Sequence, residues 1–507
     1  MSAINESSRR PAGNGGPRAT KFERSAAVTR AFVCAGLLFA AAPVRAESML
    51  EALNSTYRFN PRLDAARATL RGQDEEVARA NAGYRPTING TADVGYQNVL
   101  TTPNSPTLAG ETHPRGYGIS SIQPLFRGFR VVETVREAEA AVRAGRETLR
   151  TVEQTVLLDA ITAYSDVVRD QAIVRLRENN VRVLSEELKA TQDRFAVGEV
   201  TRTDVAQSEA RRAGSVSALD LARSNLKTSR ANFERSVGHP ANNLREQLPL
   251  RKLIPRSLDE AIAISARENP ALVNAMYREQ GARHTIEKIR GELLPVAQLE
   301  AGYTRRFDPS PVLDETRTTS VVGRVTMPFY TGGEVEARVR QAKQNHLARL
   351  QEIEQNRTEV QAQVVTAWAS FAAAQAQLVS DQATVDSNRV ALTGVRAEER
   401  VGQRTLLEVL NAEQELLNAE VALVTTKRNL VVTSYTLIQT IGRLNIQELG
   451  AEGLVYDDQA HYFEVRRKWY GLSITHGNGH HEQLDLWKSH GEADWKRRDE
   501  QSYTPSN

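Results

Sequence analysis

Charged and amide side chains follow a glycine turn in the stretch Arg400 to Glu413 of this 507-residue chain. Gly402 is followed by Arg404, Glu408 and Asn411. Side chains of these types form ion pairs that break easily, because an exposed pair contributes only about 0.2 to 1 kcal/mol. The stretch is therefore a candidate for a switchable contact rather than for a catalytic centre. The alternative is that these charges only solvate the surface of a helix turn.

The same arrangement occurs once more, 204 residues earlier, in the stretch Arg194 to Glu209. Gly198 takes the place of Gly402, and Asp204 takes the place of Glu408. The offset continues over matching apolar positions in both directions and predicts an internal duplication. A repeat this long indicates two structural halves rather than a solenoid of short units. Because an acidic residue recurs at the same place in both halves, we favour a specific contact over a solvated surface.

Motifs of catalysis and cofactor binding are absent from the sequence. It contains neither G-x-S-x-G nor a phosphate-binding glycine loop, and Cys34 is its only cysteine. We therefore expect no enzymatic activity, no cofactor and no metal. Four histidines in the polar C-terminal segment could bind a metal, but their spacing fixes no ligand geometry: His476, His480, His481 and His490. We interpret that segment as a disordered tail.

Residues 1–46 have the features of a secretory signal peptide. They contain seven basic and two acidic residues, with an apolar run from Ala31 to Ala42. This run of 12 residues is shorter than the about 20 that a membrane anchor needs, so we expect cleavage after Ala46. Cleavage changes the formal net charge from +3 to −2, and this balance implies no nucleic-acid partner.

Three long segments of the first half favour helices: Ser48 to Tyr84, residues 129–196 and Arg202 to Val237. The middle segment has apolar residues every seven positions, which is coiled-coil spacing: Val135, Val142, Leu149 and Val156. A helix of this length spans about 100 Å. The shorter helices can lie end to end along it. We therefore expect the strands at one end and the Gly198 and Gly402 turns at the other.

Alternation of apolar and polar residues predicts two strands in each half. In the last strand, four apolar residues alternate with polar ones: Val321, Val325, Met327 and Phe329. Four prolines mark the predicted transitions between strands and helices: Pro86, Pro124, Pro295 and Pro328. Such alternation also occurs in hairpins of a soluble sheet, so it does not by itself indicate a membrane.

Four strands per chain cannot close a barrel, and open strand edges are untenable in lipid. Two chains would supply eight strands, and an eight-stranded barrel is filled by side chains. Three chains would supply twelve, which leaves room for a pore. Two other classes stay open on the residues alone. A soluble periplasmic coiled-coil adaptor would not need the four strands, and a surface filament or adhesin would not explain the paired glycine turns.

Three motifs resemble those of the TolC-like outer-membrane channels, the outer membrane efflux protein family. They are Gln123-Pro124-Leu125-Phe126-x-Gly128, Met327-Pro328-Phe329-Tyr330-x-Gly332-Gly333 and the stretch Val401 to Ala412. The resemblance covers residues 48–450. It implies an α+β fold in which a homotrimer forms a twelve-stranded β-barrel in the outer membrane. A long antiparallel α-helical coiled-coil barrel continues it across the periplasm.

The resemblance also implies partners and a function. It implies an exit duct for type I protein secretion, surrounded by outer-membrane lipid. The duct would dock to an inner-membrane ABC or RND transporter through a periplasmic adaptor. The segment Tyr456 to Gly471 resembles the tail of secretion-type members, which favours protein export. The alternative within the family is a multidrug efflux pump.

The resemblance assigns roles to the residues near the glycine turns. Arg404 matches the arginine of a closing network at the periplasmic mouth, and Asp204 matches its acidic partner from the other half. Glu408 and Asn411 match positions that line the constriction. The family often has a tyrosine where this chain has Glu399. We expect a Glu399–Arg404 ion pair in its place, or no link there.

These predictions divide the chain into five parts. A signal peptide (1–46) precedes a first repeat (47–240), a linker (241–257), a second repeat (258–450) and a polar tail (451–507). Because the offset relation ends before the tail, we expect the tail to be a separate and largely disordered addition.

Overall fold

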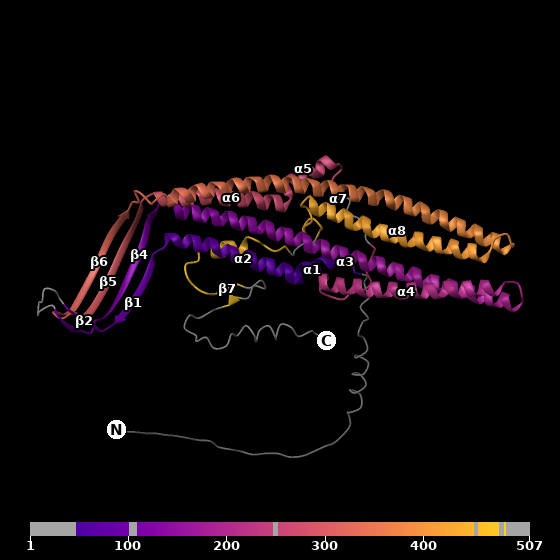
Figure 1. Cartoon of the computed structure of the whole chain (residues 1–507), viewed down its shortest axis with the longest axis horizontal. Coiled ribbons are helices and arrows are strands. Elements are labelled where there is room, and N and C mark those ends of the chain that lie inside the picture. The colour runs from indigo at the N-terminus through magenta and orange to yellow at the C-terminus, as the bar shows by residue number, and fades with distance from the viewer. Residues whose placement is uncertain (1–46, 101–108, 247–251, 451–454, 476–480, 483–507) are drawn as a thin grey trace, which may run out of the picture. The chain divides into compact units, whose positions relative to one another are not determined.

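Two series of elements follow one another in the same order in the computed structural model (Figure 1). The structure describes residues 47–100, 109–246, 252–450, 455–475 and 481–482. The predicted signal peptide, residues 1–46, lies outside them, as do His476, His480 and His490 of the tail. Each series has a helix of 11 residues, one of 21, a pair of strands, a helix of 67 and one of 36 or 35 residues.

The first series comprises α1 (Met49–Phe59), α2 (Pro61–Asn81), β1 (Thr87–Val94), β4 (Arg115–Arg127), α3 (Arg130–Ala196) and α4 (Arg202–Val237). The second comprises α5 (Leu258–Glu268), α6 (Pro270–Arg290), β5 (Val296–Ser310), β6 (Leu313–Thr326), α7 (Glu334–Arg400) and α8 (Leu406–Thr440). The short elements are η1 (Ala82–Tyr84), β2 (Gln97–Val99), β3 (Gly110–Thr112), η2 (Gly291–Leu293), α9 (Ala460–Val465), β7 (Ile474–Thr475) and β8 (His481–Glu482). An internal duplication as the origin of this order stays a prediction.

The long helices pack side by side in a layer, with the strands at one end and the helix turns at the other (Figure 1). Next to the strands the order is α2, α3, α6, α7, and toward the turns it is α4, α3, α8, α7. Three of the four heptad residues predicted on α3 are buried: Val142, Leu149 and Val156. Among the described residues, no helix combines enough length with enough apolar character to span a membrane.

The predicted helix from Ser48 to Tyr84 is wrong in one respect, because it breaks at Asn60. The Asn60 Oδ1 accepts a hydrogen bond from the Arg62 N–H at 3.0 Å and caps α2. Its Nδ2 donates to the Ser236 carbonyl, in the last turn of α4, at 3.1 Å. A residue that precedes proline is biased away from helical backbone, which explains the break before Pro61.

Asn269 makes the same contacts in the second series. Its Oδ1 accepts from the Ala271 N–H at 2.9 Å, and its Nδ2 donates to the Thr440 carbonyl at 2.9 Å. Thr440 is the last residue of α8. In each series one amide therefore joins the start of a 21-residue helix to the end of the helix that continues its line.

The four predicted strands form one antiparallel sheet in the order β1-β4-β5-β6, which confirms their number. The prediction that Met327 and Phe329 continue the last strand is wrong, because β6 ends at Thr326. Thr326 pairs with Val296, the first residue of β5, so no partner strand extends beyond it. The strands β2 and β3 form a separate two-stranded ribbon that the sequence did not predict.

Pro124 lies inside β4, at a shift in the register with β5. The prediction that it marks a strand-to-helix transition is therefore wrong. Proline has no N–H to donate to the ladder, and such an irregularity accommodates it. Gly128 and Phe129, both with φ of 61°, make the turn into α3. The other three prolines lie in loops next to strands, as predicted: Pro86, Pro295 and Pro328.

The two faces of the sheet differ in polarity, as the alternation predicted. One face carries mainly apolar and aromatic side chains between its ends: Ile88, Ile119, Leu299, Ala301, Tyr303, Val321 and Val325. The opposite face carries polar and charged ones: Asn89, Thr91, Asp93, Ser120, Glu300, Thr304, Arg306 and Arg324. Two ion pairs lie on the polar face, Arg324 with Glu300 at 2.7 Å and Arg306 with Asp93 at 3.4 Å.

The first part of the tail packs on the first series. Helix α9 contacts α2, and Arg466 pairs with Glu139 of α3 at 3.1 Å. The Tyr456 N–H donates to the Tyr57 hydroxyl at 3.0 Å. The Arg67 guanidinium lies 4.5 Å from the Tyr57 ring centre and 5.1 Å from that of Tyr456. A disordered tail therefore does not describe residues 455–475, because aromatic and ionic contacts hold them.

Two glycines, one after α4 and one after α8, allow a matched test of packing at the helix ends. Gly442 and Gly238 both have left-handed backbone, with φ of +90° and +96°. A Cβ at Gly442 would meet the Glu268 carbonyl oxygen at 2.3 Å, whereas at Gly238 the nearest atom would be the Phe59 Cβ at 3.7 Å.

We predict that Gly442→Ala lowers the apparent Tm of the purified protein more than Gly238→Ala does. The left-handed strain of about 1–2 kcal/mol is common to both variants. Only Gly442→Ala adds a clash with backbone. Thermal unfolding followed by circular dichroism at one scan rate measures the difference, and equal shifts would contradict the prediction.

Candidate functional site

The turns at the ends of α3 and α7 have the same geometry. Gly198 and Gly402 have φ of +81° and +79°. The N–H of Gly198 donates to the Phe195 carbonyl at 3.0 Å, and that of Gly402 to the Glu399 carbonyl at 2.9 Å. Glycine adopts this left-handed conformation without the steric cost of a side chain, so it ends both helices. The predicted helix turns are present at both positions.

Threonine and a carboxylate cap the helices that follow these turns. The Asp204 Oδ2 accepts from the Thr201 N–H at 2.9 Å, and the Glu408 Oε2 accepts from the Thr405 N–H at 2.9 Å. Each threonine hydroxyl accepts in return from the N–H of its carboxylate residue. These capping boxes explain why an acidic residue recurs at this place. Within the described chain no contact joins Asp204 to Arg404, its predicted partner.

Arg404 lies at the centre of the ionic contacts of the second turn. Its Nε donates to Glu398 Oε2 at 2.8 Å, and its Nη1 donates to Glu408 Oε1 at 3.0 Å. Glu399 instead accepts from Arg194 Nη1 at 2.8 Å. Of the two alternatives predicted for Glu399, the described chain therefore has the second, in which no link joins Glu399 to Arg404. Successive helix residues point about 100° apart, so Glu398 faces the turn while Glu399 faces α3.

The contacts of Arg404 are strongly solvated. The side chains of Arg404 and Glu408 are 48% and 41% exposed. The Thr405 N–H, and after it the Arg404 guanidinium, lower the pKa of Glu408, so this carboxylate is ionised at neutral pH. Pairs of this exposure contribute little to stability. The network around Arg404 can therefore open at a small cost in free energy.

Two polar contacts join the first series to the second near the turns. The Arg211 Nη2, on α4, donates to the Asn411 Oδ1, on α8, at 2.6 Å. The Arg194–Glu399 pair joins α3 to α7. The structure thus places Glu399 and Asn411 at the boundary between the two series, whereas the contacts of Arg404 and Glu408 with other described residues lie within the second.

A buried carboxylate lies behind these exposed residues, and sequence reasoning gave it no role. Glu413 is 7% exposed and accepts a hydrogen bond from Arg396. Burial raises the pKa of Glu187, and the neighbouring carboxylates of Glu413 and Glu399 raise it further. Three carboxylates and two guanidiniums thus form one cluster from α3, α7 and α8: Glu187, Glu399, Glu413, Arg194 and Arg396. We call these five residues the tip cluster.

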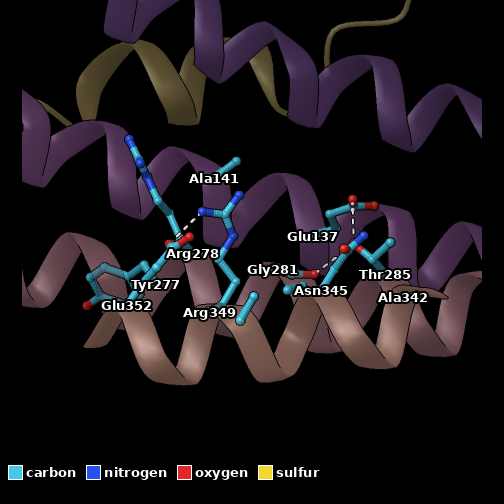
Figure 2. Close-up of a pocket in the computed structure, with 12 residues that line it drawn as sticks. Glu137, Ala141, Tyr277, Arg278, Gly281, Thr285, Ala342, Asn345, Arg349 and Glu352 are labelled. Atoms are coloured by element: carbon cyan, nitrogen blue, oxygen red, sulfur yellow. Dashed lines mark hydrogen bonds and ion pairs between the residues drawn. The ribbon is translucent and has the colours of Figure 1, made fainter. Parts of the chain in front are cut away.

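A groove of about 700 Å³ lies between α3, α6 and α7, closer to the strands (Figure 2). Its carboxylates already have partners. The Thr285 hydroxyl donates to Glu137 Oε1 at 2.8 Å, and Arg349 Nη1 donates to Glu352 Oε2 at 2.6 Å. Small residues form much of the rest of the wall: Ala141, Gly281, Ala282, Ala342 and Ala348. The wall of the groove therefore combines small apolar residues with carboxylates that are already paired.

The position of Glu137 shows which face of the helical layer the groove occupies. Glu137 and Ala141 are each two residues from Glu139, which holds the tail through Arg466. Two residues correspond to about 200° around a helix. The groove and the tail therefore lie on opposite faces of α3. Among the described residues no group of three His, Cys, Asp or Glu side chains is placed to bind a metal.

We predict that Glu187→Gln stabilises the protein at neutral pH by less than about 1 kcal/mol, a bound set by solvent screening of a partly exposed charge. A raised pKa means that the folded chain holds this proton more tightly than the unfolded chain. The stability of the wild type therefore falls as pH rises through that pKa. The substitution removes this loss, so the difference in Tm from the wild type should shrink as pH falls from 7.5 toward 5.

Glu186→Gln is the matched control, because Glu186 is the neighbouring residue and pairs only with Arg182, 3.0 Å away, among the described residues. Its Tm difference should not change in this direction with pH. A Glu187→Gln difference that is independent of pH would contradict the assigned titration.

The amino-acid sequence of this chain is similar to those of known proteins. The family profile described as "Outer membrane efflux protein" matches residues 53–239 and 262–443. The chain is 34% identical over 452 residues to outer membrane efflux protein BepC of Brucella suis, which covers 89% of this chain and 97% of BepC. It is 25% identical over 419 residues to proteases secretion protein PrtF of Dickeya chrysanthemi, with 80% and 90% covered.

The fold is similar to that of solved outer-membrane channels. The crystal structure of the CmeC outer membrane channel of Campylobacter jejuni superposes with a TM-score of 0.70 over 83% of this chain and 89% of that one, at 14% identity. The predicted resemblance to TolC-like proteins and the predicted outer-membrane location are confirmed. The chain belongs to the outer membrane efflux protein family of TolC-like channels.

Proposed function

We propose that three copies of the chain assemble into an exit duct of the outer membrane. The open edges of the sheet carry this proposal. The strands β1 and β6 are the outer strands, and in the described chain each pairs with one neighbour only. Unpaired strand edges are untenable in lipid. Pairing β6 of one copy with β1 of the next satisfies both edges, and three copies give twelve strands and room for a pore.

The unlike faces of the sheet support an orientation in that barrel. The apolar face with Ile119, Ala301 and Val321 would contact lipid, and the face with Glu300 and Arg306 would line the pore. In the helical part, the tail on α2 and α3 would lie outside the barrel. The groove between α3, α6 and α7 would then face inward. The repeated order of elements supports the proposed duplication of an ancestral half.

The tips of the helix pairs are proposed as the periplasmic gate. Gly198 and Gly402 bring Asp204, Arg404, Glu408 and Asn411 to the end farthest from the sheet. The exposed pairs of Arg404 are weak enough for a docking partner to open them. Among the described residues of one chain, the Asp204 carboxylate contacts only Thr201, so in the trimer it is available to Arg404 of an adjacent chain.

We propose protein export as the function of the duct, with a periplasmic adaptor and an inner-membrane ABC transporter as partners and no enzymatic activity. The similarity to PrtF and the ordered tail segment support this cargo. Export of small molecules through an RND or ABC pump is the second candidate. The higher identity to BepC, named as an efflux protein, favours it. A deletion strain separates the two candidates. Loss of a secreted protein from the medium supports protein export, and loss of drug resistance supports the export of small molecules.

We predict that detergent-extracted protein has the mass of three chains. The reason is that each edge strand requires a partner from another copy. Mass photometry measures the mass directly. Recovery of the mature chain as a soluble periplasmic monomer, or as a membrane dimer, would overturn the proposal.

We predict that Arg404→Ser, alone or with Asp204→Ala, increases single-channel conductance in planar bilayers. Each subunit loses a solvent-exposed ion pair of the closed gate, so the balance between closed and open gates shifts toward open. Glu408→Ala should weaken cation preference, because it removes a carboxylate from the constriction. Arg400→Ser is the matched control, since Arg400 lies four residues away on the same tip. Equal conductance in all variants would place the gate elsewhere.

A further inference from the structure

The arginines on the apolar face of β1, β4, β5 and β6 lie in two adjacent cross-strand rows. These rows are near the end of the sheet that is away from the helices. The strand register defines their members: Tyr117, Arg305 and Arg317 in one row, and Arg115, Phe307 and Glu315 in the next. We call the three arginines of these two rows together the arginine row: Arg115, Arg305 and Arg317. The four rows between it and the helices have no charged side chain on this face.

The height of the arginine row matches the border of a membrane. Val325 is the last residue of β6 on the apolar face, and Arg317 is eight residues before it. Eight residues extend about 27 Å along a strand, or about 20 Å of height at a tilt of about 40°. The apolar band of a membrane barrel is about 25 Å tall and ends in aromatic residues. Tyr303, Tyr117 and Phe307 occupy successive rows at this level.

Among the described residues, the guanidiniums of the arginine row outnumber the carboxylates that pair with them, and the Tyr117 hydroxyl also interacts with Arg305. Arg305 Nε donates to Glu315 Oε1 at 2.6 Å, and Arg317 shares the same carboxylate. Arg115 Nη1 lies 3.4 Å from Asp308 Oδ2. Three cations therefore face two carboxylates, and each arginine has five N–H donors. The side chains of Arg317 and Arg115 are 62% and 60% exposed.

We propose that the arginine row binds the phosphate groups of membrane lipids whose headgroups carry phosphomonoesters, in the leaflet away from the helices. This inference rests on the proposed barrel, which turns the apolar face toward lipid. A guanidinium binds phosphate through two parallel hydrogen bonds, which suits a row of arginines at headgroup level. The Phe307 ring, 4.6 Å from the Arg305 guanidinium, packs against that side chain from the neighbouring row, which is farther from the helices. In a trimer the rows would form a ring of nine arginines around the barrel.

The sheet contains its own matched control. Arg306 and Arg324 lie on β5 and β6 as Arg305 and Arg317 do, and each has a carboxylate partner, but they occupy the opposite face. The double variants Arg305→Gln/Arg317→Gln and Arg306→Gln/Arg324→Gln therefore remove the same charge from opposite faces. Arg115→Gln is a milder variant in case the first double variant does not fold.

The experiment measures lipid binding to the full-length trimer by native mass spectrometry. Bis-phosphorylated lipid A, its dephosphorylated form and phosphatidylcholine are the probes. The wild type and the Arg306→Gln/Arg324→Gln control should prefer the bis-phosphorylated lipid. The preference should fall roughly fivefold for each arginine removed from the row, as expected for basic residues at an anionic surface. Equal loss in both double variants, or no preference in the wild type, overturns the proposal.

Inorganic phosphate distinguishes a lipid site from a simple anion site. If inorganic phosphate in excess over the lipid abolishes the lipid preference, the arginine row binds free phosphate and the lipid assignment is overturned. The proposed function fails separately, because a soluble monomer would appear before any lipid is added. A trimer with normal conductance but no phosphate preference overturns the arginine row alone.

Discussion

Two asparagine side chains, Asn60 and Asn269, make the contacts on which the helical layer depends. The ends of every helix leave N–H and C=O groups without intrahelical partners. Here one amide satisfies both kinds, because its oxygen caps one helix and its nitrogen donates to the last turn of another. Asn269 is only 6% exposed, so water cannot substitute for it. The junction keeps two short helices in line beside a helix of 67 residues, and thereby keeps the sheet and the turns at opposite ends.

Most of the fold follows from patterns that act over a few residues. Heptad spacing identified Val142, Leu149 and Val156 as core positions, and alternation identified the four strands. The break at Asn60 was not predicted, although its Asn-Pro motif recurs at Asn269. Pro61 supplies a local cause for the break, and a contact of Asn60 with Ser236, 176 residues away, adds a distant one. The position of Pro124 inside β4 also depends on a distant partner, because the register shift exists only opposite β5.

The tip was predictable in its turns but not in its ion pairs. The glycine turns and acidic caps are local, and the sequence contains both. Which carboxylate Arg194 meets depends on how α3 and α7 face each other, so its pair with Glu399 was not predicted. The burial of Glu413 was not predictable from local sequence either, since three helices create it.

The tail contact joins parts of the chain that are made at very different times. Tyr57 and Tyr456 are 399 positions apart, and His461 contacts Asp74 across 387. Contacts between such distant positions form late in folding, because the intervening chain must first be ordered. Asp74, 1% exposed beneath α9, therefore remains hydrated until residue 461 packs against it. The first helices of the chain are completed by one of its last described segments, so the N-terminal half matures only when the whole chain folds.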